Sequence, residues 1–164
     1  MGSKVRDSRG RPVVAITGVG VVSSLGVGLD DNWSALVAGK SGIKRITRFP
    51  TEHLRTTIAG TIDFIDDDKG DLKLAIGEIA TDEAVRMAKI GRPGDFPGPL
   101  FTAIPPVELG WVARRRLYDA GDPAITDAYD RMAAVAEGLN DRSQFERVMY
   151  GWVAEKLADR FGTK

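Results

Sequence analysis

The first clear hydrophobic pattern is the run at residues 13–22, which is rich in β-branched residues and almost wholly apolar. A run of this kind is typical of a strand buried on both faces, within a sheet that helices cover. Gly18 and Gly20 lie inside the run and indicate that another backbone or side chain packs closely against it. We therefore predict a buried first strand, followed by a loop at residues 23–28.

Two helices are predicted in the first half of the chain. Residues 30–39 start with acidic capping residues and end with a glycine, as short helices do. In residues 72–87 the apolar positions repeat at helical spacing, so the charged positions between them can remain in water. The apolar positions are Leu72, Ile76, Ile79, Ala80, Ala84 and Met87, and the charged ones are Lys73, Glu78, Glu83 and Arg86. The second helix is expected to cover one face of a sheet.

Two further strands are predicted, one on each side of that second helix. Residues 56–62 have the composition of a short strand, and the acidic stretch 63–71 is predicted to be a connection. Residues 100–104 form a short apolar run that Pro105 and Pro106 end, which predicts a third strand. The alternation of strands and helices indicates an α/β chain.

Helices are also predicted in the last third of the chain. Pro106 can occupy the first turn of a helix that runs to about residue 118. Asp122 and Pro123 give a second start signal, for a helix that Gly138 ends.

The last predicted helix has the broadest apolar face of all. Ser143 and Glu146 have the spacing of a capping box at its start, and Gly162 follows its end. Its apolar positions are Phe145, Val148, Met149, Trp152, Val153, Leu157 and Phe161. A face of this width needs a large partner surface.

Composition narrows the class of protein. With 164 residues, 43% of them apolar and 28% charged, the chain has material for one globular domain. Lys plus Arg (23) equals Asp plus Glu (23), so no global field attracts nucleic acid. The absence of cysteine excludes a disulfide framework and a thiol nucleophile within these residues. There is no secretory signal and no membrane-length apolar run, so we expect a soluble cytoplasmic protein without a membrane span.

Four short motifs suggest chemistry but lack its context. The glycines of residues 18–23 suggest a dinucleotide site, but Ser23 stands where the third glycine belongs and the next helix starts too late. Residues 39–41 mimic the end of a phosphate-binding loop but follow a helix, which favours a helix C-terminus and turn. Residues 66–68 suggest a calcium loop without its later ligands, which favours a solvated acidic loop. His53, the only histidine, has no second ligand or serine partner and is expected at the surface.

A family resemblance adds what these motifs do not supply. The sequence VVAITGVGVVSSLG at residues 13–26, followed by Trp33, Leu36, GKSGI at residues 39–43 and Phe49, resembles the opening of β-ketoacyl-acyl-carrier-protein synthases. Residues 58–60 continue the resemblance, residues 72–87 resemble the family's next helix, and residues 161–164 resemble the segment just ahead of its nucleophile strand. The resemblance extends over nearly the whole chain and is strongest to about residue 62.

The resemblance implies a thiolase-like fold, with two similar α/β halves in one chain. We expect an α/β structure that is the incomplete N-terminal half of this fold, with mostly buried strands, covering helices and a helical insertion. Residues 1–12 are expected to be a flexible N-terminal segment and residues 13–164 the incomplete domain. The family's catalytic cysteine, two histidines and late lysine have no counterpart here, so we expect no catalytic residue, no cofactor and no metal, and no activity for this chain alone.

The resemblance also suggests positions for binding. It places Val107, Leu109 and Trp111 near the family's acyl pocket, with ordinary core packing as the alternative. It places Lys69 and Lys73 near the family's docking surface for acyl carrier protein. The complete enzyme is expected to be a homodimer that binds acyl carrier protein and no nucleic acid.

Three functions stay open at this point. The first is part of a 3-oxoacyl-acyl-carrier-protein synthase, which elongates acyl chains by decarboxylative condensation with malonyl-acyl carrier protein in fatty acid biosynthesis, whether of ordinary chains or of very long chains for lipid A. The second is a naturally short, non-catalytic homologue that binds acyl carrier protein or a full-length synthase. The third is a nucleotide-binding domain, which the displaced glycines argue against.

Overall fold

The computed structural model describes residues 5–65, 72–92, 94–104, 111–139, 146–147 and 149–163. Its named elements are, in chain order, β1 (Val22–Ser23), β2 (Gly26–Val27), α1 (Gly28–Val37), β3 (Ile43–Arg45), β4 (Ile58–Gly60), α2 (Leu72–Ala88), α3 (Trp111–Ala120), α4 (Ala128–Leu139) and α6 (Tyr150–Phe161). The predicted mixture of α and β structure is confirmed.

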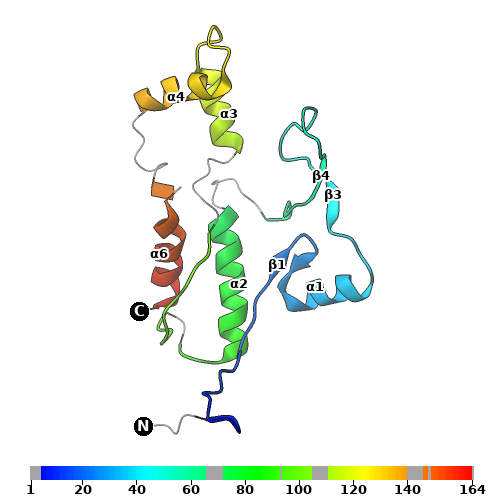
Figure 1. Ribbon diagram of the computed structural model, residues 1–164, viewed down its shortest axis with the longest axis vertical. Coiled ribbons are helices and arrows are strands. Elements are labelled where there is room, and N and C mark those ends of the chain that lie inside the picture. Colours follow the sequence, from blue (N-terminus) through cyan, green and yellow to red (C-terminus); the bar gives the residue numbers. More distant parts are fainter. Residues whose placement is uncertain are drawn as a thin grey trace.

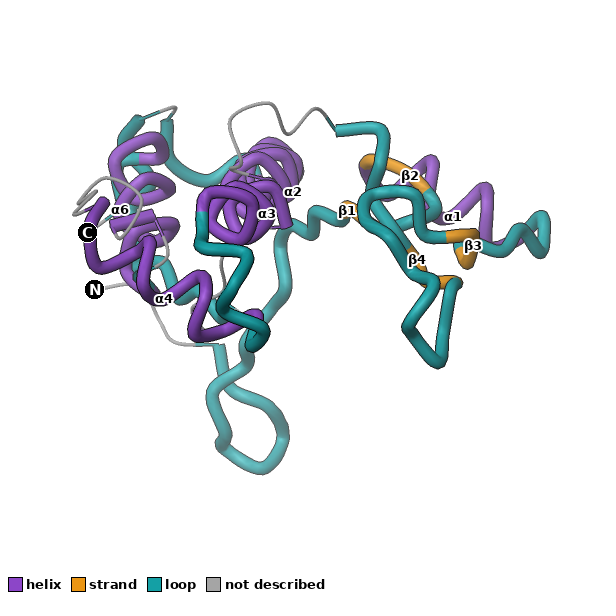
Figure 2. Tube along the Cα trace, turned by 90° about the horizontal axis from the view of Figure 1, so that it is seen from above, coloured by secondary structure: helices purple, strands orange, loops and turns teal. Residues whose placement is uncertain are grey.

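Helix α2 occupies the centre of the molecule. Helix α6 lies beside it on one side, while α1 and the short strands lie on the other side, beyond the extended N-terminal segment (Figure 1). Helices α3 and α4 pack against each other and form a hairpin near one end of α2 (Figures 1 and 2). The chain is therefore arranged around α2 rather than around a sheet.

The strands form two small antiparallel ladders, not the buried sheet that the sequence predicts. β1 pairs with β2, with Val22 opposite Val27, and β3 pairs with β4, with Lys44 opposite Ala59. The expectation of mostly buried strands is wrong for the described residues. A strand is buried on both faces only when neighbouring strands bond its backbone edges and helices cover both faces.

The predicted first strand shows this difference directly. Residues 13–21 are extended but belong to no ladder, and of the predicted run only Val22 is in a strand, β1, which continues into Ser23 of the predicted loop. The side chains of Val14 and Ile16 are 88% and 86% exposed. The run has the composition of a buried strand, but the described residues provide cover on one side only.

The prediction of close packing at Gly18 and Gly20 is confirmed. A Cβ atom on Gly18 would overlap the backbone carbonyl oxygen of Ala84, and one on Gly20 would overlap that of Ala80. Both contacts are with backbone atoms of α2, which cannot rotate away as a side chain can. Any larger residue at either position would push the extended segment off the helix.

Helices α2 and α6 form the core. Val153, Leu157 and Phe161 of α6 are buried, which confirms that this helix needs a partner surface. The partly buried residues packed against them are Leu74, Val85, Leu100, Ile104 and Trp152. Arg160 ties the same two helices together at their surface, through ion pairs of 2.9 Å to Glu78 and 2.8 Å to Asp82.

The predicted third strand, at residues 100–104, is not a strand. The segment makes no ladder with any described residue, so the prediction is wrong, although Leu100 and Ile104 do pack against the core. A short apolar run can be extended without being a strand, because a ladder forms only where a neighbouring strand bonds its backbone. The predicted strand at residues 56–62 is confirmed over its middle, as β4.

Several helix ends are close to their predicted places, with three corrections. α1 begins at Gly28, and its N-cap is Val27, without a side-chain bond, so the predicted acidic caps lie inside its first turn. Met149, part of the predicted last helix, is extended and is the N-cap of α6, which therefore begins at Tyr150. α4 is capped by Asp127, whose Oδ1 accepts hydrogen bonds from the backbone N–H groups of Tyr129 and Asp130 at 2.9 and 3.0 Å. The predicted cap, Asp122, instead accepts a bond from the N–H of Ala124 in a preceding turn. The proline after Asp122 made that site look like a helix start, but the same pair is also common in turns. Ser143, the predicted cap of the last helix, lies outside the described residues.

Candidate functional site

Glu83 of α2 binds two other segments of the chain. Its Oε1 accepts a hydrogen bond from the backbone N–H of Leu29 at 2.7 Å, and its Oε2 accepts one from the N–H of Val21 at 3.0 Å. These bonds, that from Leu29 first, lower the pKa of the Glu83 carboxyl. The prediction that Glu83 can remain in water holds only in part, because Glu83 is half-buried and the extended segment and the first turn of α1 reach its carboxylate.

A buried amide fixes the loop between the extended segment and α1. The side-chain Nδ2 of Asn32 donates to the carbonyl oxygens of Gly26 and Gly28 at 3.1 and 2.7 Å, and its Oδ1 accepts a bond from the Ser23 hydroxyl. The Ser23 Oγ also accepts a bond from the N–H of Leu25 at 3.1 Å. The loop therefore uses its polar groups internally, which argues against the dinucleotide site suggested by residues 18–23.

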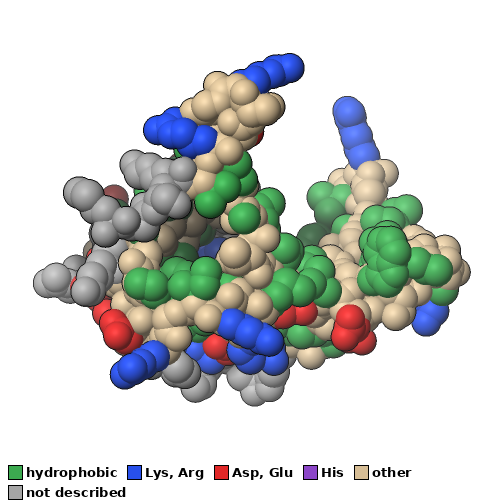
Figure 3. Space-filling view, turned by 90° about the horizontal axis from the view of Figure 1, so that it is seen from below, with side chains coloured by type: hydrophobic (Ala, Val, Ile, Leu, Met, Phe, Trp, Pro, Cys, Tyr) green, Lys and Arg blue, Asp and Glu red, His purple; other side chains and the backbone are tan. Residues whose placement is uncertain are grey.

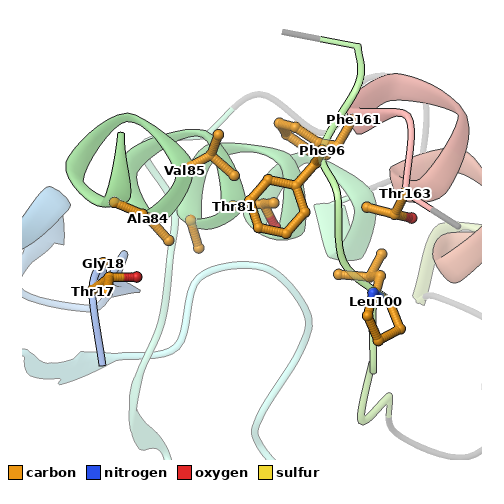
Figure 4. Close-up of a pocket in the computed structure, with 12 residues that line it drawn as sticks. Thr17, Gly18, Thr81, Ala84, Val85, Phe96, Leu100, Phe161 and Thr163 are labelled. Carbon is orange, nitrogen blue, oxygen red and sulfur yellow. The ribbon is translucent and has the colours of Figure 1, made fainter. Parts of the chain in front are cut away.

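An apolar cleft of about 350 Å³ lies beside α2. Thr17 and Gly18 of the extended segment stand on one side of it, Phe96 and Leu100 stand on the other, and α2 forms the floor (Figure 4). Its lining residues are Thr17, Gly18, Ala80, Thr81, Ala84, Val85, Ala88, Phe96, Pro99, Leu100, Phe161 and Thr163. No acidic or basic side chain lines it, so it suits an apolar partner.

A second cleft, of about 320 Å³, lies between α1 and α2 and is more polar. Asp30, Asp31 and Glu83 line it together with Arg86. Among the residues that the structure describes, no group of three His, Cys, Asp or Glu side chains is placed to hold a metal ion. Since Glu83 already accepts two backbone hydrogen bonds, we assign this cleft no ligand.

Of the predicted binding residues, the structure describes only Trp111 and Lys73. Trp111 begins α3, is 40% exposed, and lies with its ring centroid 6.0 Å from that of Phe49; it lines neither cleft. Lys73 is exposed in the first turn of α2. Val107, Leu109 and Lys69 lie outside the described residues, so the acyl-pocket and carrier-docking roles stay predictions.

The motifs judged non-functional from the sequence can now be placed. Residues 39–41 follow α1, and the N–H groups of Gly39 and Lys40 donate to the carbonyls of Leu36 and Ala35, which confirms the helix C-terminus and turn. His53 is exposed, as predicted. Residues 66–68 lie outside the described part of the chain. Within that part, no helix is long and apolar enough to cross a membrane.

Small residues in the sequence mark where the extended segment and α2 meet beside the cleft. Gly18 and Gly20 are two residues apart, which places them on one side of an extended chain, and Ala80 and Ala84 are four apart, which places them on one side of a helix. Small residues at both spacings allow the two backbones to meet. Phe96 and Thr163 carry no such signal, because only the tertiary structure brings them to the cleft.

Comparison with known proteins identifies the family. The family model described as the N-terminal domain of β-ketoacyl synthase matches residues 11–92, half of the chain. The chain belongs to the β-ketoacyl synthase family. The matched residues include the extended segment, α1, both small ladders and α2. The 164 residues include no cysteine, so they do not supply the nucleophile of a ketosynthase that reacts through a cysteine.

Curated ketosynthases from two pathways are similar to this chain. The 3-oxoacyl-[acyl-carrier-protein] synthase 2 of Coxiella burnetii is 55% identical over 49 residues, which are 30% of this chain and 12% of that protein. The actinorhodin polyketide putative beta-ketoacyl synthase 2 of Streptomyces coelicolor is 48% identical over 50 residues, again 30% of this chain and 12% of the relative. The chain thus spans about an eighth of the length of these relatives, and the matches do not separate fatty acid from polyketide pathways.

Solved structures support the fold over most of the chain. The ishigamide ketosynthase/chain length factor superposes with a TM-score of 0.55 at 20% identity, over 90% of this chain and 36% of that one. A type II polyketide acyl-carrier protein in complex with its ketosynthase gives a TM-score of 0.56 at 22% identity, over 91% of this chain and 35% of that one. The described residues therefore form part of a ketosynthase fold.

Proposed function

We propose that this chain is the N-terminal part of a 3-oxoacyl-acyl-carrier-protein synthase that elongates acyl chains in fatty acid biosynthesis, in the cytoplasm. The observation that carries the proposal is the family match over residues 11–92, together with a ketosynthase fold over most of the chain. Within the proposal we choose fatty acid synthesis over polyketide synthesis on the higher identity of the fatty acid relative alone, 55% over 49 residues against 48% over 50 residues.

The chain's part in the reaction is structural. Decarboxylative condensation needs a thiolate to hold the acyl group and donors to stabilise the developing negative charge. These residues contain no cysteine, and their one histidine, His53, is exposed. The catalytic groups must therefore come from polypeptide outside residues 1–164, and this chain alone is expected to be inactive.

A chimaera tests this function. The segment of the Coxiella synthase that corresponds to residues 11–92 is replaced by those residues, and elongation of an acyl-carrier-protein substrate by malonyl-acyl carrier protein is measured. Because the segment carries the fold and not the nucleophile, the rate should stay within about tenfold of the parent enzyme. The matched control carries the same graft with Gly20→Val, which should lower the melting temperature and the yield of active enzyme, since overpacking against α2 costs about 1–3 kcal/mol. A soluble chimaera that melts like the parent and has no activity would contradict the proposal.

Carrier docking through Lys69 and Lys73 is part of the same proposal, as is a homodimer for the complete enzyme. A related ketosynthase has been solved in complex with an acyl-carrier protein, and Lys73 is exposed on α2. Carrier proteins are acidic, so a lysine at their docking surface would raise the association rate. Lys73→Glu in the chimaera should raise KM for the carrier substrate more than it lowers kcat, whereas Lys40→Glu, which is exposed beyond the C-terminal end of α1, should leave both unchanged.

An acyl-pocket role for Val107, Leu109 and Trp111 is the second residue-level part of the proposal. The position of Trp111 at the start of α3, against Phe49, supports ordinary packing as much as a pocket wall. Leu109→Trp in a complete enzyme that includes these residues distinguishes the two readings. A pocket role predicts a shift to shorter acyl substrates, while a packing role predicts lower stability with unchanged chain-length preference.

The absence of cysteine supports a second candidate, a naturally short and non-catalytic homologue that binds acyl carrier protein or a full-length synthase. The mass of the intact protein from its native source separates the two. A mass of 17.7 kDa, that of these residues, together with micromolar binding to acyl carrier protein or to a synthase, would favour the short homologue. A much larger mass would favour the synthase.

A further inference from the structure

Basic residues gather in two segments that lie far apart in the sequence. Residues 44–57, which include most of β3 and the loop that leads to β4, hold four basic residues and one acidic residue, Glu52. Residues 111–118, the larger part of α3, hold three basic residues and no acidic one. The whole chain has no net charge, so this positive charge is local. The basic residues of the two segments are Lys44, Arg45, Arg48, Arg55, Arg114, Arg115 and Arg116.

A contact between two aromatic rings joins these segments. The ring centroids of Phe49 and Trp111 are 6.0 Å apart. Arg48 precedes Phe49 in the chain, and Arg115 lies one turn after Trp111 on the same side of α3. α3 and the loop between β3 and β4 lie at the same end of the molecule, where α2 also begins (Figure 1). The fold therefore combines the positive charge of residues 44–57 and 111–118 in one region, which we call the arginine surface.

Three guanidinium groups of the arginine surface are available for a partner. Arg45, Arg55 and Arg116 are exposed, and none of them makes an ion pair or a side-chain hydrogen bond with a residue that the structure describes. The planar fork of a guanidinium matches the two oxygens of a carboxylate, and such charge-assisted pairs are stronger than neutral hydrogen bonds. The arginine surface therefore suits a partner whose own surface is rich in carboxylates. Two other basic residues are already paired, Lys44 with Asp63 and Arg115 with Asp119.

A lipid surface is the competing partner, and the mixing of side chains on α3 argues against it. A helix that lies on a membrane keeps its apolar residues on one side and its basic residues on the other. On α3 the exposed Val112 shares its side with Arg116, and Trp111, which is 40% exposed, shares its side with Arg115. Figure 3 shows the opposite end of the molecule, where hydrophobic side chains gather in the middle and Lys and Arg side chains lie at the margins. Arginine and tryptophan side by side are instead typical of contacts between proteins.

We propose that the acidic acyl carrier protein docks on the arginine surface, with its carboxylates on Arg45, Arg55 and Arg116. The inference rests on the proposed function and deepens it, because it names the residues of this chain that receive the partner. α3 lies outside residues 11–92, so the match to the family model does not assign it this role. A stable interface covers roughly 20–30 residues on each partner, which is enough to include both segments. Docking then extends well beyond Lys73, in the first turn of α2.

The experiment measures binding of the carrier protein to residues 1–164. The acyl carrier protein that serves the Coxiella synthase is labelled with fluorescein, and its fluorescence anisotropy is followed as the chain is added. The glutamate variant, Arg45→Glu with Arg55→Glu and Arg116→Glu, should raise the Kd at least about tenfold, because attraction becomes repulsion at three positions. The lysine variant, with Arg→Lys at the same positions, keeps the charge and should stay within about threefold of the unchanged chain.

A matched control separates a docking surface from the effect of overall charge. Arg9→Glu, Lys40→Glu and Arg92→Glu together change the net charge by the same amount, at exposed positions outside the arginine surface. Charges more than a Debye length from the contact are screened, so this control should change the Kd by less than about twofold. Raising the salt concentration from about 50 mM to about 300 mM should weaken binding by the unchanged chain more than binding by the glutamate variant.

Other results overturn the inference. These are no binding of the carrier protein, an equal loss in the glutamate variant and the matched control, a loss with Lys73→Glu alone but not with the glutamate variant, and tighter binding to phosphatidylglycerol vesicles than to the carrier protein. If the glutamate variant loses its circular dichroism spectrum, Arg→Gln at the same positions decides, and a rise in Kd of less than about threefold overturns the inference.

The chimaera separates this inference from the proposed function. If the chimaera is active while the glutamate variant binds the carrier protein normally, the proposed function stands and the arginine surface is not the docking site. If the chimaera is folded and inactive, the proposed function itself is wrong.

Discussion

At the residue scale, a single carboxylate holds together parts of the chain that are more than fifty positions apart. Glu83 receives the N–H groups of Val21 and Leu29, and so joins the end of the extended segment and the start of α1 to α2. Charge-assisted bonds of this kind favour the ionised carboxylate. Its pKa therefore lies below its ordinary value, for a structural reason and without a catalytic one.

The stability of the chain should depend on the ionisation of Glu83. Because the folded-state pKa is lowered, the contribution is fully present above the ordinary value of 4.5 and is lost as pH falls through the folded pKa. Glu83→Gln should lower the free energy of unfolding by about 1 kcal/mol at neutral pH and by less in acid. The control is Glu137→Gln on the exposed side of α4, which should change stability little at either pH. Denaturant titrations at pH 7 and pH 4 measure both, and an equal loss at the two pH values would count against the role of charge.

A glycine of the extended segment gives the second prediction at this scale. Gly20→Val places a side chain against the backbone carbonyl of Ala80, and overpacking of this kind costs about 1–3 kcal/mol. Gly138→Ala, in α4, meets no atom within 4 Å and should be neutral or stabilise the helix, since alanine has the higher helix propensity. Thermal melts measure both variants. Gly20→Val should lower the melting temperature by several degrees, and Gly138→Ala should leave it unchanged or raise it.

At the element scale, α6 owes its place to one stripe of side chains. Val153, Leu157 and Phe161 recur every four residues and face α2, where Leu74 and Val85 meet them. Arg160, which precedes Phe161, pairs with Glu78 and Asp82 of α2. The buried stripe and the ion pairs of Arg160 therefore join the same two helices, α2 and α6, although exposed ion pairs add little stability by themselves.

Truncation of the central member of that stripe should separate the two helices. Leu157 is 3% exposed, and Leu157→Ala should cost about 2–4 kcal/mol through lost burial and the cavity that remains. Met149→Ala, ahead of α6 and exposed, is the matched control and should cost less than about 0.5 kcal/mol. Chemical denaturation followed by far-ultraviolet circular dichroism measures both, and equal effects would show that α6 is not held by this stripe.

At the scale of the whole molecule, the described residues bury little for their number. No large side chain among them is fully buried, and hydrophobic side chains of the extended segment, α1 and the small ladders remain exposed. Stability rises with the fraction of apolar surface that folding removes from water. The core between α2 and α6 thus leaves much apolar surface of the described residues in contact with water.

This exposure predicts how the isolated chain behaves. Residues 1–164 should bind the dye 8-anilinonaphthalene-1-sulfonate and unfold over a broad temperature range, since exposed apolar surface and loose packing produce both effects. The complex with the remaining part of the Coxiella synthase should bind little dye and melt over a narrow range. A chain that melts sharply and ignores the dye would indicate a self-sufficient domain and favour the short homologue.

The sequence by itself determined the helices α1, α2 and α6, the close approach at Gly18 and Gly20, and the family. Helix periodicity, caps and small residues act over a few positions, so they can be recognised without knowledge of distant parts of the chain. Only the tertiary structure decided the partners of Glu83, the exposure of residues 13–17 and the absence of a strand at residues 100–104. These three features depend on segments that are distant in the sequence. A hydrogen bond or a ladder forms only where the backbone of such a segment lies within hydrogen-bonding distance.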